Sequence, residues 1–192
     1  LGFGFITFSY FRYAQREALH LSERERGIFL DCLSKISEEI DYPVDNHSAD
    51  LISANIQLLL EYLSRFYDRQ FITRHNVNSS VVATFEKQLS EIFAAGRIID
   101  EVPKVSYFAE KANLSPSYFG DLIKRETGNT PQDIITLRLI AEAKRCLAAT
   151  DTDISIIAYD LGFRYPQHFT RLFKRVTGKS PSIFRKEFIS HN

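Results

Sequence analysis

The chain has 192 residues, of which 44% are hydrophobic and 25% charged, with 24 basic and 24 acidic side chains. These ordinary values for a globular protein exclude a disordered, collagen-like or low-complexity chain. The length allows one large domain or two small ones. The two cysteines, Cys32 and Cys146, lie far apart, which excludes a disulfide framework and a cysteine-based zinc site. We therefore expect a reducing, cytoplasmic setting.

Charge is distributed unevenly along the chain. Residues 1–100 hold 10 basic and 14 acidic side chains, whereas residues 101–192 hold 14 and 10. Within residues 163–192 seven side chains are basic and one is acidic. A localised positive field of this kind is typical of a protein that binds a polyanion, although a solvated helix face gives the same count.

The N-terminal residues are aromatic and β-branched. Residues 5–13 read Phe-Ile-Thr-Phe-Ser-Tyr-Phe-Arg-Tyr, which predicts one or two short β-strands. The stretch lacks a basic leader and is too short to span a bilayer. Because the chain contains no methionine, we expect either a fragment or an edited sequence. Since few other strands are predicted for these residues to pair with, we expect the segment to be the remnant of a sheet that begins before Leu1.

Two amphipathic helices are expected next. Ser22 and Glu25 have the spacing of a capping box, and an apolar stripe follows them. After a breaker at residues 41–46, a second helix is predicted over about residues 48–71. The two helices form an antiparallel hairpin that cannot cover both of its stripes, so one stripe packs inside the chain or on a second copy. The candidate dimer-interface residues are Leu51, Leu58, Tyr62 and Phe66.

A polar stretch, residues 75–80, marks the expected domain boundary. Ser79 or Ser80 is expected to cap a helix over about residues 81–95. The predicted domains are residues 1–78, with the sheet remnant and the hairpin, and residues 79–192.

An internal repeat dominates the second domain. Residues 119–131 and 169–181 are identical at seven of thirteen positions, at an offset of 50 residues. A small alanine precedes a turn upstream of each copy, so each copy predicts a helix-turn-helix. The two units are expected over about residues 105–128 and 154–178.

A long helix is predicted between the two units. It begins at Thr130 and Pro131 and continues to about Ala149, and at 1.5 Å per residue it would be about 28 Å long. Because one turn of B-DNA is about 34 Å, a connector of this length suits two units in successive major grooves on one side of the duplex.

The second copy also carries a family resemblance. It reads Ile-Ser-Ile-Ile-Ala-Tyr-Asp-Leu-Gly-Phe at 154–163, His-Phe-Thr-Arg-Leu-Phe-Lys-Arg at 168–175 and Gly-Lys-Ser-Pro at 178–181. With these motifs, residues 81–188 resemble the DNA-binding domain of the AraC/XylS family of bacterial transcription regulators. Residues 1–78 are similar, less sharply, to the end of that family's cupin-like sensor domain and its helical dimerisation hairpin.

The expected fold is all-α for nearly all of the chain: a hairpin, then two helix-turn-helix subdomains joined by a long helix. The resemblance implies a sequence-specific transcription factor that binds double-stranded DNA as a homodimer and contacts RNA polymerase. Effector binding is left open, because most of the sensor barrel is absent from the sequence. No phosphate-binding glycine loop, nucleophile motif or metal-ligand spacing appears, so no enzyme, cofactor, metal or membrane association is expected. The alternative is a protein-interaction module with a vestigial DNA surface.

The start of the second recognition helix carries the side chains expected to read bases. Glutamine can pair with adenine and arginine with guanine, and the threonine methyl group contacts thymine. These candidates are Pro166, Gln167, His168, Thr170 and Arg171. The corresponding positions of the first unit are Ser117, Tyr118, Gly120 and Asp121. This is a poorer set, because glycine has no side chain and aspartate repels phosphate. The candidate phosphate contacts, which fix register without reading sequence, are Lys124, Arg125, Lys174, Arg175 and Lys179.

Overall fold

The structure is a computed structural model that describes residues 8–94, 98 and 101–190. Within these residues the regular structure is helical, as predicted. The α-helices are α1 (Glu23–Asp41), α2 (Ser48–Thr73), α3 (His75–Ala94), α4 (Val105–Lys111), α5 (Pro116–Thr127), α6 (Pro131–Ala149), α7 (Ile154–Asp160), α8 (Pro166–Thr177) and α9 (Pro181–Ser190). None of these helices combines the length and the apolar character that crossing a membrane requires.

The chain divides into two compact bodies, which differ from the two helix-turn-helix units. The first consists of the residues up to Ser79 together with Leu114–Leu122, and the second consists of Ser80–Asn113 and the residues from Ile123 onward. The first seven residues of α5 therefore belong to the body that contains α1 and α2.

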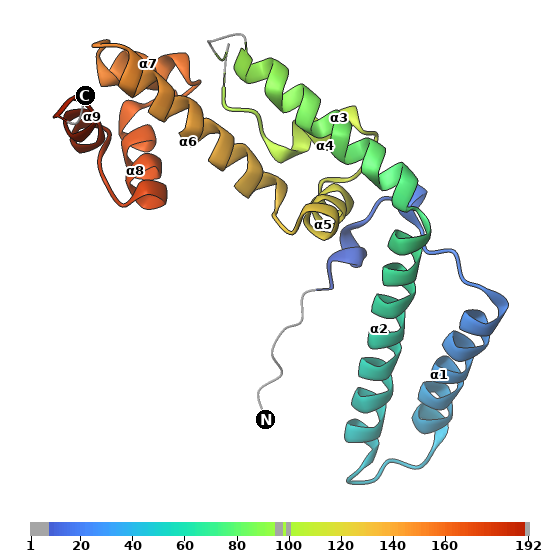
Figure 1. Cartoon of the computed structure of the whole chain (residues 1–192). Helices are drawn as coiled ribbons and strands as arrows, with labels where there is room; N and C mark the ends of the chain where they lie inside the picture. The colour runs from blue at the N-terminus through green and yellow to red at the C-terminus, as the bar shows by residue number, and fades with distance from the viewer. Residues whose placement is uncertain (1–7, 95–97, 99–100, 191–192) are drawn as a thin grey trace. The chain divides into compact units, whose positions relative to one another are not determined.

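Helices α1 and α2 form the expected antiparallel hairpin in the first body (Figure 1). The predicted capping box is present at the start of α1: the Ser22 amide donates to the Glu25 carboxylate at 2.8 Å, and the Glu25 amide donates to Ser22 Oγ at 3.4 Å. The same carboxylate accepts from Arg69 Nε of α2 at 2.6 Å. One acidic side chain thus caps α1 and ties it to α2.

The prediction of β-strands over residues 5–13 is wrong for Ser9–Arg12, which forms a 3-10 helix, η1. A second 3-10 helix, η2, follows at Gln15–Glu17, and residues 5–7 lie outside the described part of the chain. The physical reason is that the aromatic side chains pack on a helix instead of pairing with a strand. The ring of Tyr10 stacks on Tyr67 of α2 at 5.1 Å, and its hydroxyl donates to the Leu60 carbonyl at 3.1 Å.

The polar residues 75–80 are helical, so the predicted caps at Ser79 and Ser80 are wrong. Helix α3 begins at His75, directly after the single non-helical residue Arg74. Asn78 bonds across this junction: its side chain is buried, and Nδ2 donates to the Phe71 carbonyl at the end of α2 at 3.0 Å. The Arg74 amide donates to the same carbonyl at 3.2 Å, so both a side chain and the backbone satisfy the end of α2.

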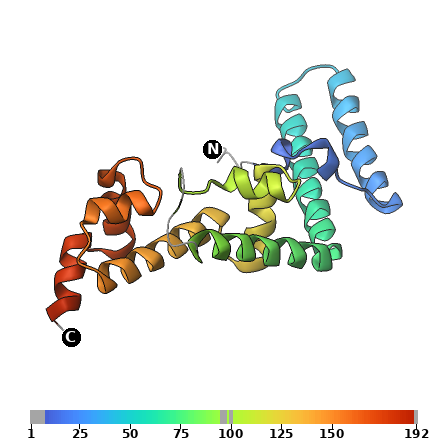
Figure 2. The same ribbon diagram turned by 90° about the horizontal axis from the view of Figure 1, so that it is seen from above.

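In the second body, α7, α8 and α9 gather at the C-terminal end of α6 (Figure 2). The rings of Phe169 and Phe173 are fully buried, and Phe173 meets Phe184 of α9 at 5.6 Å. Arg185 of α9 also donates to the Thr152 carbonyl at 2.7 Å. These contacts make a packed core behind α8, which leaves the opposite face of that helix to solvent.

Candidate nucleic-acid interface

Two helix–turn–helix segments occur where the repeat predicts them. In each segment the residue at the turn has positive φ, 54° at Asn113 and 80° at Gly162. The alanines four residues earlier, Ala109 and Ala158, are fully buried. Side chains this small let neighbouring elements approach closely, as the sequence pattern indicates.

The second turn is more constrained than the first. A Cβ atom on Gly162 would lie 2.9 Å from Ile98 Cγ2 and 2.9 Å from the Val102 amide nitrogen. The same neighbouring backbone is hydrogen-bonded to the turn, with the Ile98 amide donating to the Asp160 carbonyl at 2.7 Å and Val102 donating to Gly162 at 3.3 Å. Gly162 is therefore required both by its φ and by this close approach.

The repeated Thr-Gly-x-Ser/Thr-Pro sequence ends one helix and starts the next. Thr177 Oγ1 donates to the Phe173 carbonyl at 2.8 Å and accepts from the Lys179 amide at 3.3 Å. Thr127 makes the equivalent bonds to Ile123 and Asn129, at 2.7 and 3.2 Å. The motif is thus a capping device.

Helix α8 presents its candidate reading residues on one exposed face. Gln167, His168 and Arg171 are exposed, and Pro166 and Thr170 are partly exposed. Proline occupies the first turn of the helix, where its missing N–H costs nothing. Residues one and four positions apart at a helix N-terminus can reach adjacent bases from a major groove. The structure therefore brings the second unit's predicted residues together on an accessible surface.

Two aromatic contacts of Tyr165, the residue just before α8, were missed by the sequence analysis. The guanidinium of Arg164 lies 5.5 Å from the centre of the Tyr165 ring, and the Tyr165 ring meets the His168 ring edge-on at 5.6 Å. The exposed pair of a cation and an aromatic residue just before Pro166 was the signal available in the sequence.

The candidate phosphate contacts fall into two groups. Lys124, Arg125, Lys174 and Arg175 are exposed in the last turns of α5 and α8. Lys179 is also exposed, but its ammonium group pairs with the Glu187 carboxylate at 2.6 Å. A phosphate would have to compete with this pair, so Lys179 is the weakest member of the set.

The first unit's candidates are in a different environment. Tyr118 is only 4% exposed, stacked on Phe71 at 4.9 Å, and burial raises the pKa of its hydroxyl despite the opposing effect of Arg74. Asp121 accepts a hydrogen bond from the Tyr13 hydroxyl at 2.6 Å. Ser117 and Gly120 are partly exposed. Two of the four positions expected to face DNA, Tyr118 and Asp121, are thus engaged with α2 or with the N-terminal segment.

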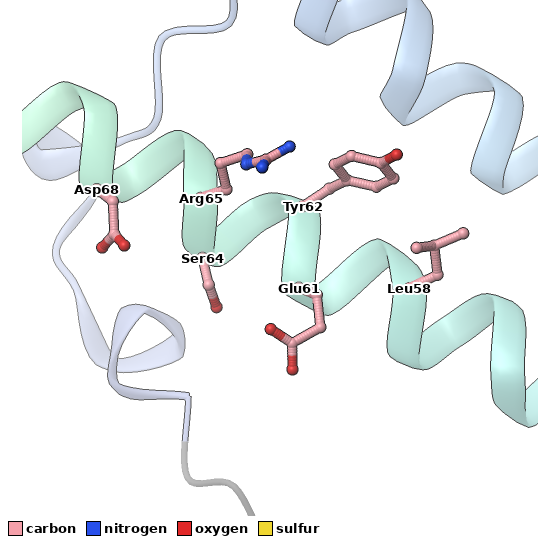
Figure 3. A pocket seen from close by; sticks show the side chains of 6 residues that line it. All are labelled: Leu58, Glu61, Tyr62, Ser64, Arg65 and Asp68. Carbon is pink, nitrogen blue, oxygen red and sulfur yellow. The ribbon is translucent and has the colours of Figure 1, made fainter.

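The four dimer candidates on α2 also differ in exposure. Leu51 and Leu58 are 47% and 43% exposed, Tyr62 is half-buried, and Phe66 is buried within the chain. A shallow hollow runs along the same helix, and Figure 3 shows Leu58, Tyr62 and Arg65 pointing to one side and Glu61, Ser64 and Asp68 to the other. Its polar groups do not converge, which a small-molecule site requires.

No group of three or more histidine, cysteine or acidic side chains suited to a metal ion occurs among the described residues. Cys32 is buried and Cys146 is partly buried, and both are free thiols. Burial raises the pKa of the Cys146 thiol, which keeps it protonated at neutral pH.

Comparisons with known proteins agree with this geometry. A family model described as a helix-turn-helix domain matches residues 108–187. The chain is 31% identical over 86 residues to YobQ of Bacillus subtilis, an uncharacterized HTH-type transcriptional regulator, and the match covers 45% of this chain and 36% of that protein. The family match falls within residues 81–188, which resemble the DNA-binding domain of AraC/XylS regulators. Residues 108–187 therefore form a helix-turn-helix domain of the AraC type.

Other relatives match over about half of the chain. The arabinose operon regulatory protein of Escherichia coli is 27% identical over 111 residues, 57% of this chain and 38% of that protein. The solved C-terminal domain of AraT, a response regulator from Geobacillus stearothermophilus, has a TM-score of 0.50 at 25% identity, covering 56% of this chain and 84% of that domain. The chain spans little more than a third of the length of the two curated relatives named here.

Proposed function

We propose that the chain is part of a transcription regulator that binds specific sequences in double-stranded DNA through its AraC-type domain. The observation that carries the proposal is the exposed face of α8. Gln167, His168 and Arg171 lie together at the start of a helix whose other side is packed on a core of phenylalanines. Such a helix can enter a major groove with donors and acceptors facing the base edges.

The basic side chains behind this face supply the sequence-independent part of binding. Within the described part of the chain, Arg171, Lys174 and Arg175 form no ion pair, so their charges are available to phosphates. Contacts of this kind position the protein and make its affinity depend on salt.

The proposal extends to two units on one duplex. Helix α6 has 19 residues, so it is about 28 Å long, against about 34 Å for one turn of B-DNA. We place the domain boundary near residue 79, with units over about 105–128 and 154–178. The second unit is assigned most of the base discrimination, because its reading positions are the exposed ones.

Dimerisation through the α1–α2 hairpin is a further part of the proposal. Leu51 and Leu58 supply exposed apolar surface on α2, whereas Phe66 is already used inside the chain. The same regulator would act in the cytoplasm, contact RNA polymerase and carry out no catalysis of its own, because these properties accompany a bacterial transcription regulator.

The test is the selection of binding sites from random duplexes by the full chain. We expect one enriched sequence, in two half-sites if the protein is dimeric. Arg171→Ala together with Gln167→Ala should reduce affinity for that sequence by about 30-fold or more, since each of the two base contacts removed is worth about 1–3 kcal/mol. Weak, salt-dependent binding should remain.

Lys186→Ala is the charge-matched control, because Lys186 is exposed on α9 and outside the reading face. It should change the salt dependence slightly and leave the selected sequence unchanged. If the double variant selects the same sequence as the natural chain with equal affinity, α8 is not the reading helix. If no sequence is enriched at all, the chain is a protein-interaction module.

A further inference from the structure

Residues 8–21, here called the strap, are fixed to the C-terminal end of α2, where Figure 1 shows them in blue. Gln70 of α2 is buried and hydrogen-bonds to the strap backbone as both acceptor and donor. It accepts from the His20 amide at 2.9 Å and donates to the Ala18 carbonyl at 3.2 Å. Arg69 donates to the His20 carbonyl at 2.6 Å. The strap is therefore part of the hairpin structure and moves with it.

The strap also holds the start of α5 through a buried carboxylate. Glu17 is 2% exposed, and its oxygens accept from the Ser115 amide at 2.6 Å and from the Ser115 hydroxyl at 2.5 Å. The amide of Ala14 donates to the same carboxylate at 2.7 Å. Ser115 in turn caps α5, since its Oγ accepts from the Tyr118 amide at 3.2 Å. A buried carboxylate with three donors is stable only while those donors remain in place.

Tyr13 of the strap covers the adjacent reading positions. Its hydroxyl donates to Asp121 Oδ2 at 2.6 Å, and its ring meets the Tyr118 ring edge-on at 5.0 Å. Burial, reinforced by the Asp121 carboxylate, raises the pKa of the Tyr13 hydroxyl well above its ordinary value. The hydroxyl thus remains a donor over the whole physiological range.

We propose that the strap is an autoinhibitory latch on the first recognition helix. Glu17 and Tyr13 hold Ser115, Tyr118 and Asp121, so these positions at the start of α5 are not free to enter a groove, whereas Ser117 and Gly120 stay partly exposed. Releasing the strap frees Ser115 and Asp121 and removes the Tyr13 ring from Tyr118, which lets the first unit join the second on DNA. Because the strap is anchored to α2, a rearrangement of the hairpin, such as pairing with a second copy, can supply the release. The inference rests on the proposed DNA binding.

Tyr13 and Ser115 are partly exposed, whereas Glu17 is buried. Single substitutions that keep the size of the side chain can weaken the latch's hydrogen bonds at either position. Tyr13→Phe deletes the bond to Asp121 and keeps the ring and the net charge. Glu17→Gln replaces one acceptor oxygen by a donor that faces donors of Ala14 or Ser115. If the latched state limits binding, both variants raise the fraction of competent protein and tighten apparent affinity, by about tenfold for a strongly latched chain.

The experiment measures the affinity of the full chain for its selected duplex and the hydrogen exchange of the α5 amides in the absence of DNA. Tyr42→Phe and Glu23→Gln are the matched controls, since both residues are exposed and outside the strap. Glu23→Gln also measures the effect on DNA affinity of removing one negative charge. We expect Tyr13→Phe and Glu17→Gln to speed exchange at Tyr118 and to tighten binding beyond these controls.

The double variant Tyr13→Ala with Glu17→Ala completes the test. Faster exchange with unchanged or weaker DNA binding would overturn the latch, because the strap would then position α5 for binding. Unchanged exchange in the double variant would also overturn it, because the strap would not restrain the helix. If neither the natural chain nor any variant selects a DNA sequence, the proposed function itself is wrong. This outcome differs from equal DNA affinity across the natural chain and all variants, which would overturn only the latch.

Discussion

The two recognition helices descend from one repeated sequence, yet they present different surfaces. In α8 the third helical residue is His168, exposed, and the sixth is Arg171, also exposed. In α5 the same positions hold Tyr118, buried against Phe71, and Asp121, bonded to Tyr13. The repeat has kept the residues that shape the helices and their turns, together with the exposed Lys-Arg pair, and it has changed the residues at the start of each helix. Common ancestry of the fold therefore does not give the two units the same task.

The largest expected effect tests whether the two copies depend equally on their cores. Phe119 and Phe169 occupy equivalent positions, and both are fully buried. Phe→Ala at either site should lower the free energy of unfolding by about 3–5 kcal/mol, measured by urea denaturation followed by circular dichroism. A small effect at Phe119 alone would mean that the first unit contributes little to the stability of the chain.

An exchange of turn residues should have an intermediate and unequal effect. Asparagine tolerates positive φ, so Gly162→Asn isolates the contact of the new Cβ with Ile98 and Val102, and we expect a loss of about 1–3 kcal/mol in unfolding free energy. Asn113→Gly should change it by about 1 kcal/mol or less, through chain entropy alone. Thermal unfolding of the two variants provides the measurement. Equal losses would show that the backbone of residues 98–102 yields to the new side chain.

The smallest expected effect concerns the repeated caps. Thr127→Val and Thr177→Val keep the shape of the side chain and remove its hydrogen bonds, so each should cost about 1 kcal/mol. The two costs should agree, because the bonds have nearly the same lengths in both copies. Denaturant midpoints of the two variants check this, and a marked difference between them would mean that the caps are not equivalent.

Local patterns predicted the parts of the fold that depend on neighbouring residues. The capping box of Ser22 and Glu25, the hairpin, the repeat with its positive-φ turns and the polar, exposed face of α8 were all visible in the sequence. The interpretation of residues 5–13 as strands failed at Ser9–Arg12 because the sequence shows the same aromatic residues whether they pair with a strand or pack on α2.

The engagement of α5 was beyond the reach of sequence reasoning for a different reason. Glu17 and Ser115 are 98 positions apart, and the residues around either one do not predict a contact with the other. A lone glutamate near an N-terminus is ordinarily a solvated charge. Similarly, Asn78 gave no sign that it would satisfy the end of α2, since asparagine is common in loops and the stretch around it is polar. Long-range polar contacts carry no periodicity from which they could be inferred.

The backbone bonds between Ile98, Val102 and the second turn bear on how small an independently folding reader can be. The family match begins at residue 108, yet the amide of Ile98 caps the carbonyl of Asp160, and the Ile98 side chain lies against Gly162. A fragment trimmed to the family boundaries would leave that carbonyl unpaired and that glycine uncovered. The minimal autonomous DNA reader therefore starts upstream of Ile98, and truncations for crystallisation or binding assays are best made there.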